Sequence, residues 1–244
     1  TEAMRIDSSG NLGIGTSLPA VQNNGAGIVL DLANTGSAST TADNAELVVR
    51  SSSRYAALTF ITPADKASTI NFGDTDDSNI GIIQYDHAND AMSFNTNAAE
   101  RMRINSAGIV TKPYQPAFRA CKDTGDTSST GYIVWNASKI NVGGHYSTST
   151  GKFTAPVAGN YYFAVRALTA SATQNNIWIG INHNGNSVLQ TYHSHINHSN
   201  ISGEAVITMA ANDYVQTYWG GTGSIHTGGT NHHIYSFFQG HLIG

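Results

Sequence analysis

The chain has 244 residues, a formal net charge of −4 and only 11% charged residues, beside 25 glycines. A weakly negative chain without a basic stripe is a poor nucleic-acid binder, so we predict no nucleic-acid partner. No apolar run reaches 18 residues, which predicts no membrane insertion, and low charge with ample apolar content favours a folded, turn-rich β protein over a disordered one.

The first half opens with a pattern that occurs twice. Residues 2–10 (EAMRIDSSG) return as residues 100–108 (ERMRINSAG), at an offset of 98 residues. Met and Ile alternate with Arg before a glycine turn in each copy, which predicts one short strand per copy and one complete repeat between them. Because Thr1 is not Met and the opening looks like the end of a repeat, we expect the C-terminal piece of a longer protein.

Further short strands are predicted between the two copies, at residues 27–32, 46–50, 56–61, 69–72, 80–85 and 91–95. Strands this short bury too little surface to stand alone. The segments 4–16 (MRIDSSGNLGIGT), 70–74 (INFGD), 83–87 (IQYDH) and 92–104 (MSFNTNAAERMRI) resemble shaft repeats of bacteriophage tail fibres and related viral structural proteins. This resemblance implies a trimeric shaft, in which three chains share one core.

Composition changes sharply near residue 112. Residues 1–112 hold 12 of the 16 acidic residues, whereas residues 113–244 hold nine of ten histidines, nine of 11 tyrosines and all three tryptophans. Pro113 and Pro116 fall at the change, and two prolines within four residues favour a stiff, extended connector. We therefore predict a fibre shaft or repeat region over residues 1–112 and a head over residues 113–244.

The head reads as a succession of strands, at residues 117–121, 132–135, 146–153, 160–170, 177–182, 187–195, 203–209, 212–219 and 234–244. Asn184-Gly185 between two of them is a strong hairpin signal. Residues 141–163 (NVGGHYSTSTGKFTAPVAGNYYF) closely resemble the signature of the complement C1q family. Near the end of the chain, Gln239 departs from that family, which usually has Ser before the glycine at this position. The resemblance implies a trimeric, ten-stranded jelly-roll head. The predicted fold class is thus all-β throughout.

Aromatic residues are the candidates for ligand binding in the head. Its composition is rich in Asn, Ser, Thr, His and Tyr and poor in charge, which suits neutral polar ligands and sugar rings that stack on aromatic side chains. The candidates are Trp219, Tyr218, Tyr192 and Trp178. The alternative is that each of them is a core or trimer contact, and it stays open.

A His-x-His pair, His193 and His195, is the sharpest chemical feature. Residues i and i+2 of a strand face one side, so three chains meeting on a threefold axis would offer six imidazoles to a transition metal. Some phage fibre tips use such rings. The alternative is a solvent-facing polar strand end. No other cofactor is expected.

The sequence offers few residues suited to catalysis. The head has few carboxylates for a two-carboxylate glycosidase, no Ser-His-Asp or Cys-His signature appears, and Cys121, the only cysteine, is predicted to be a buried structural thiol. We predict that the protein is not an enzyme.

These patterns together predict the distal part of a viral (phage) tail fibre. In this interpretation a homotrimer recognises a host-surface glycan or protein through its head and contacts other virion tail proteins, so it lies in the virion or is otherwise extracellular. Two alternatives stay open: the head is a trimerisation clamp without a ligand, or the chain is a secreted cellular adhesin.

Overall fold

The computed structural model describes residues 4–6, 12–14, 30–32, 58–122, 130–170, 174–196, 199–226 and 232–244. The chain divides into two compact units, residues 1–59 and residues 60–244. Within the described residues the secondary structure is β-strand apart from one short helix, α1 (His232–Tyr235). None of these residues belongs to a helix that is long and apolar enough to cross a membrane.

The first unit contains one small sheet. Strand β1 (Met4–Ile6) pairs antiparallel with β2 (Leu12–Ile14), which pairs parallel with β3 (Leu30–Leu32). The strand predicted at 27–32 is therefore confirmed over its last three residues. The strand predicted at 46–50 lies outside the described residues.

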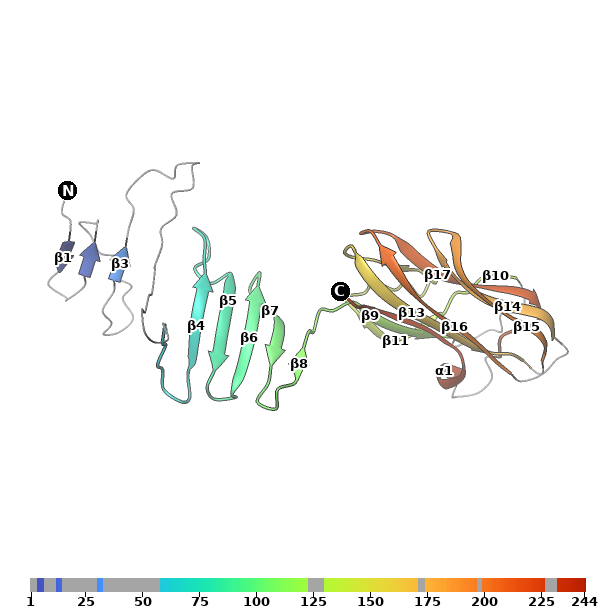
Figure 1. The fold of residues 1–244 in the computed structure, drawn as a ribbon, viewed down its shortest axis with the longest axis horizontal. Helices are drawn as coiled ribbons and strands as arrows, with labels where there is room; N and C mark the ends of the chain where they lie inside the picture. Colours follow the sequence, from blue (N-terminus) through green and yellow to red (C-terminus); the bar gives the residue numbers. More distant parts are fainter. Residues whose placement is uncertain are drawn as a thin grey trace, which may run out of the picture. The chain divides into compact units, whose positions relative to one another are not determined.

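The second unit begins with a five-stranded antiparallel meander, in which each strand pairs with the next along the chain (Figure 1, cyan to green). Three of the predicted strands and the second repeat copy are confirmed here. The strand predicted at 56–61 is wrong over residues 58–61, which are in no strand, and its first two residues lie outside the described residues. The strands are β4 (Ala67–Phe72), β5 (Gly81–Asp86), β6 (Ala91–Thr96), β7 (Ala99–Ile104) and β8 (Val110–Thr111).

The sequence repeat is also a structural repeat. In the first copy Ile6 pairs with Leu12 across β1 and β2. In the second copy Ile104 pairs with Val110 across β7 and β8. Both partners are shifted by the same 98 residues, so the two copies form the same hairpin in the same register.

The meander has one apolar and one polar face, because side chains alternate along each strand. One row across β4 to β7 consists of Ile70, Ile83, Phe94 and Met102, whereas the neighbouring row on the other face consists of Thr69, Gln84, Ser93 and Arg103. On the apolar face Ile70 remains 43% exposed and Phe72 56% exposed. A sheet normally buries such a face against a second layer, and the described residues leave Ile70 and Phe72 on this face partly exposed.

The head, residues 117–244, is a sandwich of two antiparallel sheets (Figure 1, green to red). Sheet one has the order β11-β9-β18-β13-β16, and sheet two the order β10-β17-β14-β15, with β12 also pairing to β17. This is an all-β jelly-roll fold, with ten described strands. Their bounds are β9 (Ala117–Cys121), β10 (Gly131–Tyr132), β11 (Ala137–Val142), β12 (Phe153–Thr154), β13 (Gly159–Leu168), β14 (Gln174–His183), β15 (Asn186–Ile196), β16 (Asn200–Met209), β17 (Tyr214–Thr222) and β18 (Phe237–Leu242).

Aromatic side chains fill the space between the two sheets. The ring of Phe118 lies 4.8 Å from Tyr146 and 4.9 Å from Phe153, centroid to centroid, and both pairs are stacked. Trp135 is fully buried, and its Nε1 donates to the Thr217 hydroxyl at 2.8 Å. The core thus explains why most of the head's aromatic residues are where they are.

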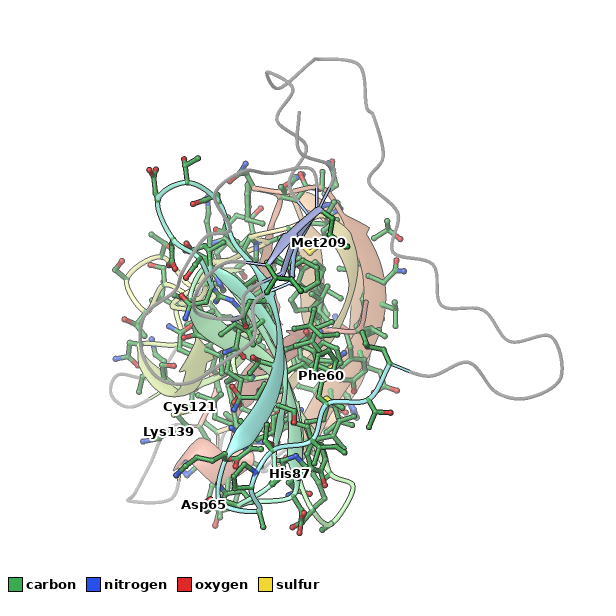
Figure 2. The ribbon with its side chains drawn as sticks, turned by 90° about the vertical axis from the view of Figure 1, so that its left-hand side faces the viewer. Phe60, Asp65, His87, Cys121, Lys139 and Met209 are labelled. Carbon is green, nitrogen blue, oxygen red and sulfur yellow. The ribbon has the colours of Figure 1, made fainter. Side chains whose placement is uncertain are left out.

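Three details of the head differ from the predicted strands. Of the predicted strand 132–135 only Tyr132 is in a strand, at the end of β10 (Gly131–Tyr132), while the side chains of Ile133 and Trp135 are fully buried in the core. The segment 146–153 contributes a single bridge, and α1 occupies part of the predicted strand 234–244. Strand β11 was missed. Cys121 is buried, as predicted (Figure 2).

Candidate functional site: an aromatic strip on the head

Strand β14 shows why aromatic residues reach the outer surface of sheet two. Its isoleucines at positions 177, 179 and 181 are fully buried in the core. Alternation along the strand places Trp178 on the opposite, outward face. In β17 the same alternation buries Trp219 and turns Tyr218 outward.

Four rings form a continuous row on this outward face, which we call the aromatic strip: Tyr132, Tyr218, Trp178 and Tyr192. Tyr132 pairs with Tyr218, and Trp178 with Tyr192, across neighbouring strands. The ring centroids lie 5.2 Å apart for Tyr132 and Tyr218, 4.9 Å for Tyr218 and Trp178, and 6.0 Å for Trp178 and Tyr192. Tyr218 and Trp178 are nearly parallel, at 14°. The strip therefore crosses β10, β17, β14 and β15.

Two glycines form the floor under the indole of Trp178. A Cβ at Gly220 would lie 2.1 Å from both Nε1 and Cε2 of Trp178. A Cβ at Gly180 would lie 3.2 Å from its Cζ3. The indole thus packs directly against the backbone of two strands, and any larger residue at position 220 would displace it.

The strip is accessible and uncharged. Tyr192 is 63% exposed and Tyr132 46% exposed, whereas Trp178 and Tyr218 are half-buried. The Tyr192 hydroxyl donates to the Gln190 side chain at 2.8 Å. An aromatic surface flanked by uncharged polar groups is the kind of surface that binds ligands combining apolar and hydroxyl faces.

Polar residues continue the outward face beside the strip. Asn182 and Gln216 are register partners on β14 and β17, and they are 8% and 6% exposed. The Gln216 amide donates to the Thr150 carbonyl at 2.9 Å. The Oδ1 of Asn182 is buried and accepts no hydrogen bond. A buried acceptor without a donor is costly, so a hydroxyl or water would be stabilising there.

The structure brings together three of the four predicted ligand residues. Trp178, Tyr192 and Tyr218 lie in the strip, whereas Trp219 lies inside the sandwich with 0% exposure and donates through Nε1 to the Gly223 carbonyl at 2.9 Å. Trp219 therefore has a packing role. Tyr132 was missed, because only the pairing of β10 with β17 places it beside Tyr218. Whether the strip binds a ligand stays a prediction.

The predicted histidine pair lies on β15, away from the strip. His193 is the register partner of Ile177, whose side chain points into the core, so His193 is on the opposite face of the strand from Tyr192. The side chain of His195 lies outside the described residues. The residues that are described include no group of three or more His, Cys, Asp or Glu that could hold a metal. The metal site stays a prediction.

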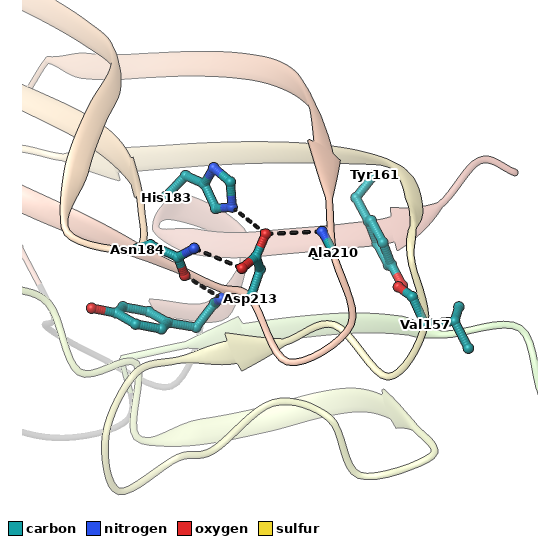
Figure 3. Close-up of polar contacts among 7 residues, drawn as sticks. Val157, Tyr161, His183, Asn184, Ala210 and Asp213 are labelled. Carbon is teal, nitrogen blue, oxygen red and sulfur yellow. Dashed lines mark hydrogen bonds and ion pairs between the residues drawn. The ribbon is translucent and has the colours of Figure 1, made fainter.

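The Asp213 side chain connects two turns at one end of the sandwich through polar contacts (Figure 3). Its carboxylate accepts from Asn184 Nδ2 at 2.7 Å and from the Ala210 amide at 2.9 Å, and it lies 2.9 Å from His183 Nε2. Led by the bond from Asn184, these contacts hold the pKa of Asp213 below its ordinary value. The carboxylate is thus committed to joining the β14–β15 turn to the β16–β17 turn, which is a structural task.

The outward face of sheet one differs in character from the strip. It carries a depression of about 500 Å³, lined in part by Tyr162, Arg166, Glu204 and Phe237. The Tyr162 hydroxyl donates to Glu204 at 2.6 Å, and the guanidinium of Arg119 lies 4.1 Å from the centre of the Phe237 ring. This face mixes charge with partly exposed apolar groups, in contrast to the uncharged strip.

Residues 117–243 match the C1q domain, and they are the residues of the sandwich just described. The chain belongs to the C1q domain family. Mouse complement C1q tumor necrosis factor-related protein 3 is 28% identical over 131 residues, covering 53% of this chain and 51% of that protein. Mouse protein 2 of the same series is 35% identical over 77 residues, covering 31% of this chain and 25% of that protein.

Among solved structures, the globular domain of zebrafish complement 1qA protein is similar to the C1q domain of this chain. It has 20% sequence identity and a TM-score of 0.42, and the match covers 53% of this chain and 98% of that one. The chain spans about half the length, or less, of the curated relatives it matches. These relatives come from mammals and lend no support to a phage tail fibre, whereas a secreted adhesin is compatible with them.

Proposed function

We propose that this chain is an extracellular, homotrimeric recognition module, whose C1q domain presents the aromatic strip to a cell-surface ligand. The observation that carries the proposal is the strip itself. Four rings in one row, two of them about half or more exposed, stand on the solvent face of a sheet that has its own complete core on the other face. The fold does not need these rings on the outside, so a ligand is the better reason for them.

The trimer is supported by family membership and by the other sheet. The outward face of sheet one carries exposed Val206 near Arg166 and Glu204 at its β16 edge and exposed Ile140 at its β11 edge, a mixture that can be self-complementary between copies. If sheet one faces the other protomers, sheet two and its strip face outward. Each copy of the strip then remains available to ligand.

The meander gives a second, independent reason for association. Its apolar face, with Ile70 and Phe72 still exposed, needs a covering layer. Only residues 112–116 separate β8 from β9, so a trimer of heads would hold three meanders at high effective concentration. We propose that the apolar faces of three copies cover one another, with the head as a clamp and a ligand-binding module at once.

The secreted adhesin is the setting that the relatives favour. The tail-fibre setting is the second candidate, and one observation favours it: the repeated β-hairpin, with its 98-residue period, is the kind of unit from which long shafts are built. In that setting other virion proteins would be partners. In both settings the head would hold the trimer together and bind a cell-surface ligand.

Sedimentation equilibrium and a cell-binding assay test the proposal. We expect a trimer, and we expect the fluorescently labelled trimer to bind the surface of its target cells. Removal of residues 113–244 should abolish cell binding, since it removes the strip, and should weaken the trimer, since it removes the clamp and leaves only the meander faces to associate. A monomeric full chain would contradict the trimer. A trimer whose cell binding is unchanged by the deletion would contradict recognition by the head.

A further inference from the structure

We infer that the aromatic strip binds a linear, uncharged glycan along its length, with sugar rings packed on its two exposed end rings, Tyr132 and Tyr192. The inference rests on the proposed function and deepens it by naming the ligand class. Three features of the strip carry it: its chemistry, its openness and its polar border.

The chemistry selects an uncharged ligand with apolar faces. Pyranose rings present C–H groups on their faces and hydroxyls at their edges, so they stack on aromatic rings while their hydroxyls form hydrogen bonds. None of the four strip residues carries a charge at neutral pH. A polyanionic glycan would instead require Lys or Arg to pair with its acidic groups.

The shape selects a chain over a single terminal sugar. The rings follow one another at 5.2, 4.9 and 6.0 Å across four adjacent strands. Tyr132 stands edge-on to Tyr218 at 86°, and Tyr218 stacks on Trp178 at 14°, so the exposed end rings Tyr132 and Tyr192 are the platforms for sugar rings. The strip is also an open row on a sheet face, with exposed rings at both ends, so a chain can extend past Tyr132 and past Tyr192.

The border supplies hydrogen-bonding groups of the right kind. Gln190 already accepts from the Tyr192 hydroxyl. Asn182, on the same face of β14 as Trp178, has a buried Oδ1 without a donor. That oxygen is covered by protein, so the border groups that a sugar can reach are the exposed Gln190 amide and the Tyr192 hydroxyl.

Tryptophan fluorescence gives a direct test, because two of the three tryptophans are fully buried and inaccessible to a quencher in solution. Trp135 and Trp219 are 0% exposed, and Trp178 is half-buried in the strip. Quenching by acrylamide therefore reports on Trp178. The probes are β-1,4-linked cellohexaose, mannohexaose and xylohexaose, each titrated into the intact protein at up to millimolar concentration. We expect at least one of them to protect Trp178 from the quencher and a heparin hexasaccharide to leave it quenched.

Two variants with exposed side chains test the location of the site. Tyr192→Ala and Tyr132→Ala should each weaken binding of the protecting hexasaccharide roughly tenfold in calorimetry. Tyr235→Ala is the matched control, since Tyr235 is exposed on α1, outside the strip, and it should bind like the wild type. The corresponding disaccharide should bind more weakly than the hexasaccharide, since it covers fewer rings.

The outcomes separate this inference from the proposed function. Failure of all three hexasaccharides, tighter binding of heparin, or equal loss in Tyr235→Ala overturns the inference. If the intact trimer still binds cells and Tyr192→Ala abolishes that binding while no hexasaccharide protects Trp178, the strip recognises a protein and only the ligand class is wrong. If the trimer binds no cells at all, the proposed function itself fails.

Discussion

Gly220→Ala is the sharpest test of the strip, because it alters the floor without removing any aromatic ring. The new methyl would sit 2.1 Å from Nε1 and Cε2 of Trp178, whereas carbon atoms pack at about 3.5–4.0 Å. The indole must therefore move by about 1.5 Å or more, judged against that contact distance. It cannot move into the sheet, so it has to lift or turn away from Tyr218.

The expected cost to folding is small and the expected cost to binding is larger. Overpacking costs about 1–3 kcal/mol, and the lower backbone entropy of Ala in the unfolded chain returns about 0.5–1 kcal/mol. The net loss, about 1 kcal/mol, is well below the 5–15 kcal/mol that ordinarily holds a domain folded. Loss of the aligned indole face should weaken hexasaccharide binding roughly two- to tenfold.

Chemical denaturation measures the first quantity and calorimetry the second. Gly244→Ala is the matched control, because a Cβ there meets nothing within 4 Å and the position carries no positive φ. It should leave both quantities unchanged. If Gly220→Ala binds the hexasaccharide as tightly as the wild type, with the same acrylamide quenching of Trp178, the floor does not position the indole and the reasoning is refuted.

Three further predictions concern a turn of the head, the core of the head and the apolar face of the meander. Asp213→Asn should make the free energy of unfolding fall less steeply at acidic pH. The folded-state pKa of Asp213 is depressed, so its contribution to stability is present above the ordinary value of 3.8 and is lost as pH falls through the folded pKa. Denaturation midpoints from pH 7 down to about pH 2 would show this, and parallel curves for both proteins would contradict it. Phe238→Ala should cost about 3–5 kcal/mol, since Phe238 is fully buried and packs edge-on against Phe118 at 4.9 Å, and a loss under 1 kcal/mol would mean that this core is not packed as described. Phe72→Asp should weaken self-association measured by sedimentation while leaving the melting of the head unchanged, because Phe72 is 56% exposed on the apolar face of the meander; unchanged association would show that this face has another occupant.

The C1q-like signature was readable from sequence because local backbone requirements fix its residues. Gly143 and Gly144 have φ of 78° and 74°, a region that Gly adopts without strain. The Asn141 side chain donates to the Tyr146 carbonyl at 2.9 Å and accepts from the Tyr146 amide at 3.0 Å. Burial raises the pKa of the Tyr146 hydroxyl, which donates to the Trp135 carbonyl at 3.0 Å. The glycine conformations and the two bonds between Asn141 and Tyr146 are met within a few residues, so a linear pattern can record them, whereas the bond to Trp135 spans 11 positions.

The strip was only partly predictable, because its geometry is set by contacts between distant strands. Trp178 and Tyr192 flank a hairpin whose Asn-Gly turn is visible in the sequence, and Asn184 and Gly185 do adopt positive φ. Tyr132 and Tyr218 meet through pairing across 86 positions, which no local pattern encodes. Likewise, Trp219 could not be told from Tyr218 as core or surface until the register of β17 was known. The aromatic composition pointed to a site, and the sheet order decided its members.

The glycines at positions 180 and 220 bear on whether the strip is more than packing. Gly in a strand interior weakens the strand, and β-branched or aromatic residues are preferred there. At position 180 the sheet itself requires glycine, because a Cβ there would lie 2.9 Å from the Leu189 carbonyl oxygen. At position 220 only the indole of Trp178 occupies the space that a Cβ would take, so a sheet that served only to cover a core would gain by filling that position. The sheet gives up local stability at position 220, where the indole of Trp178 requires the room, and an outward row of aromatic rings is useful to a ligand, whereas the core on the other face has no need of it.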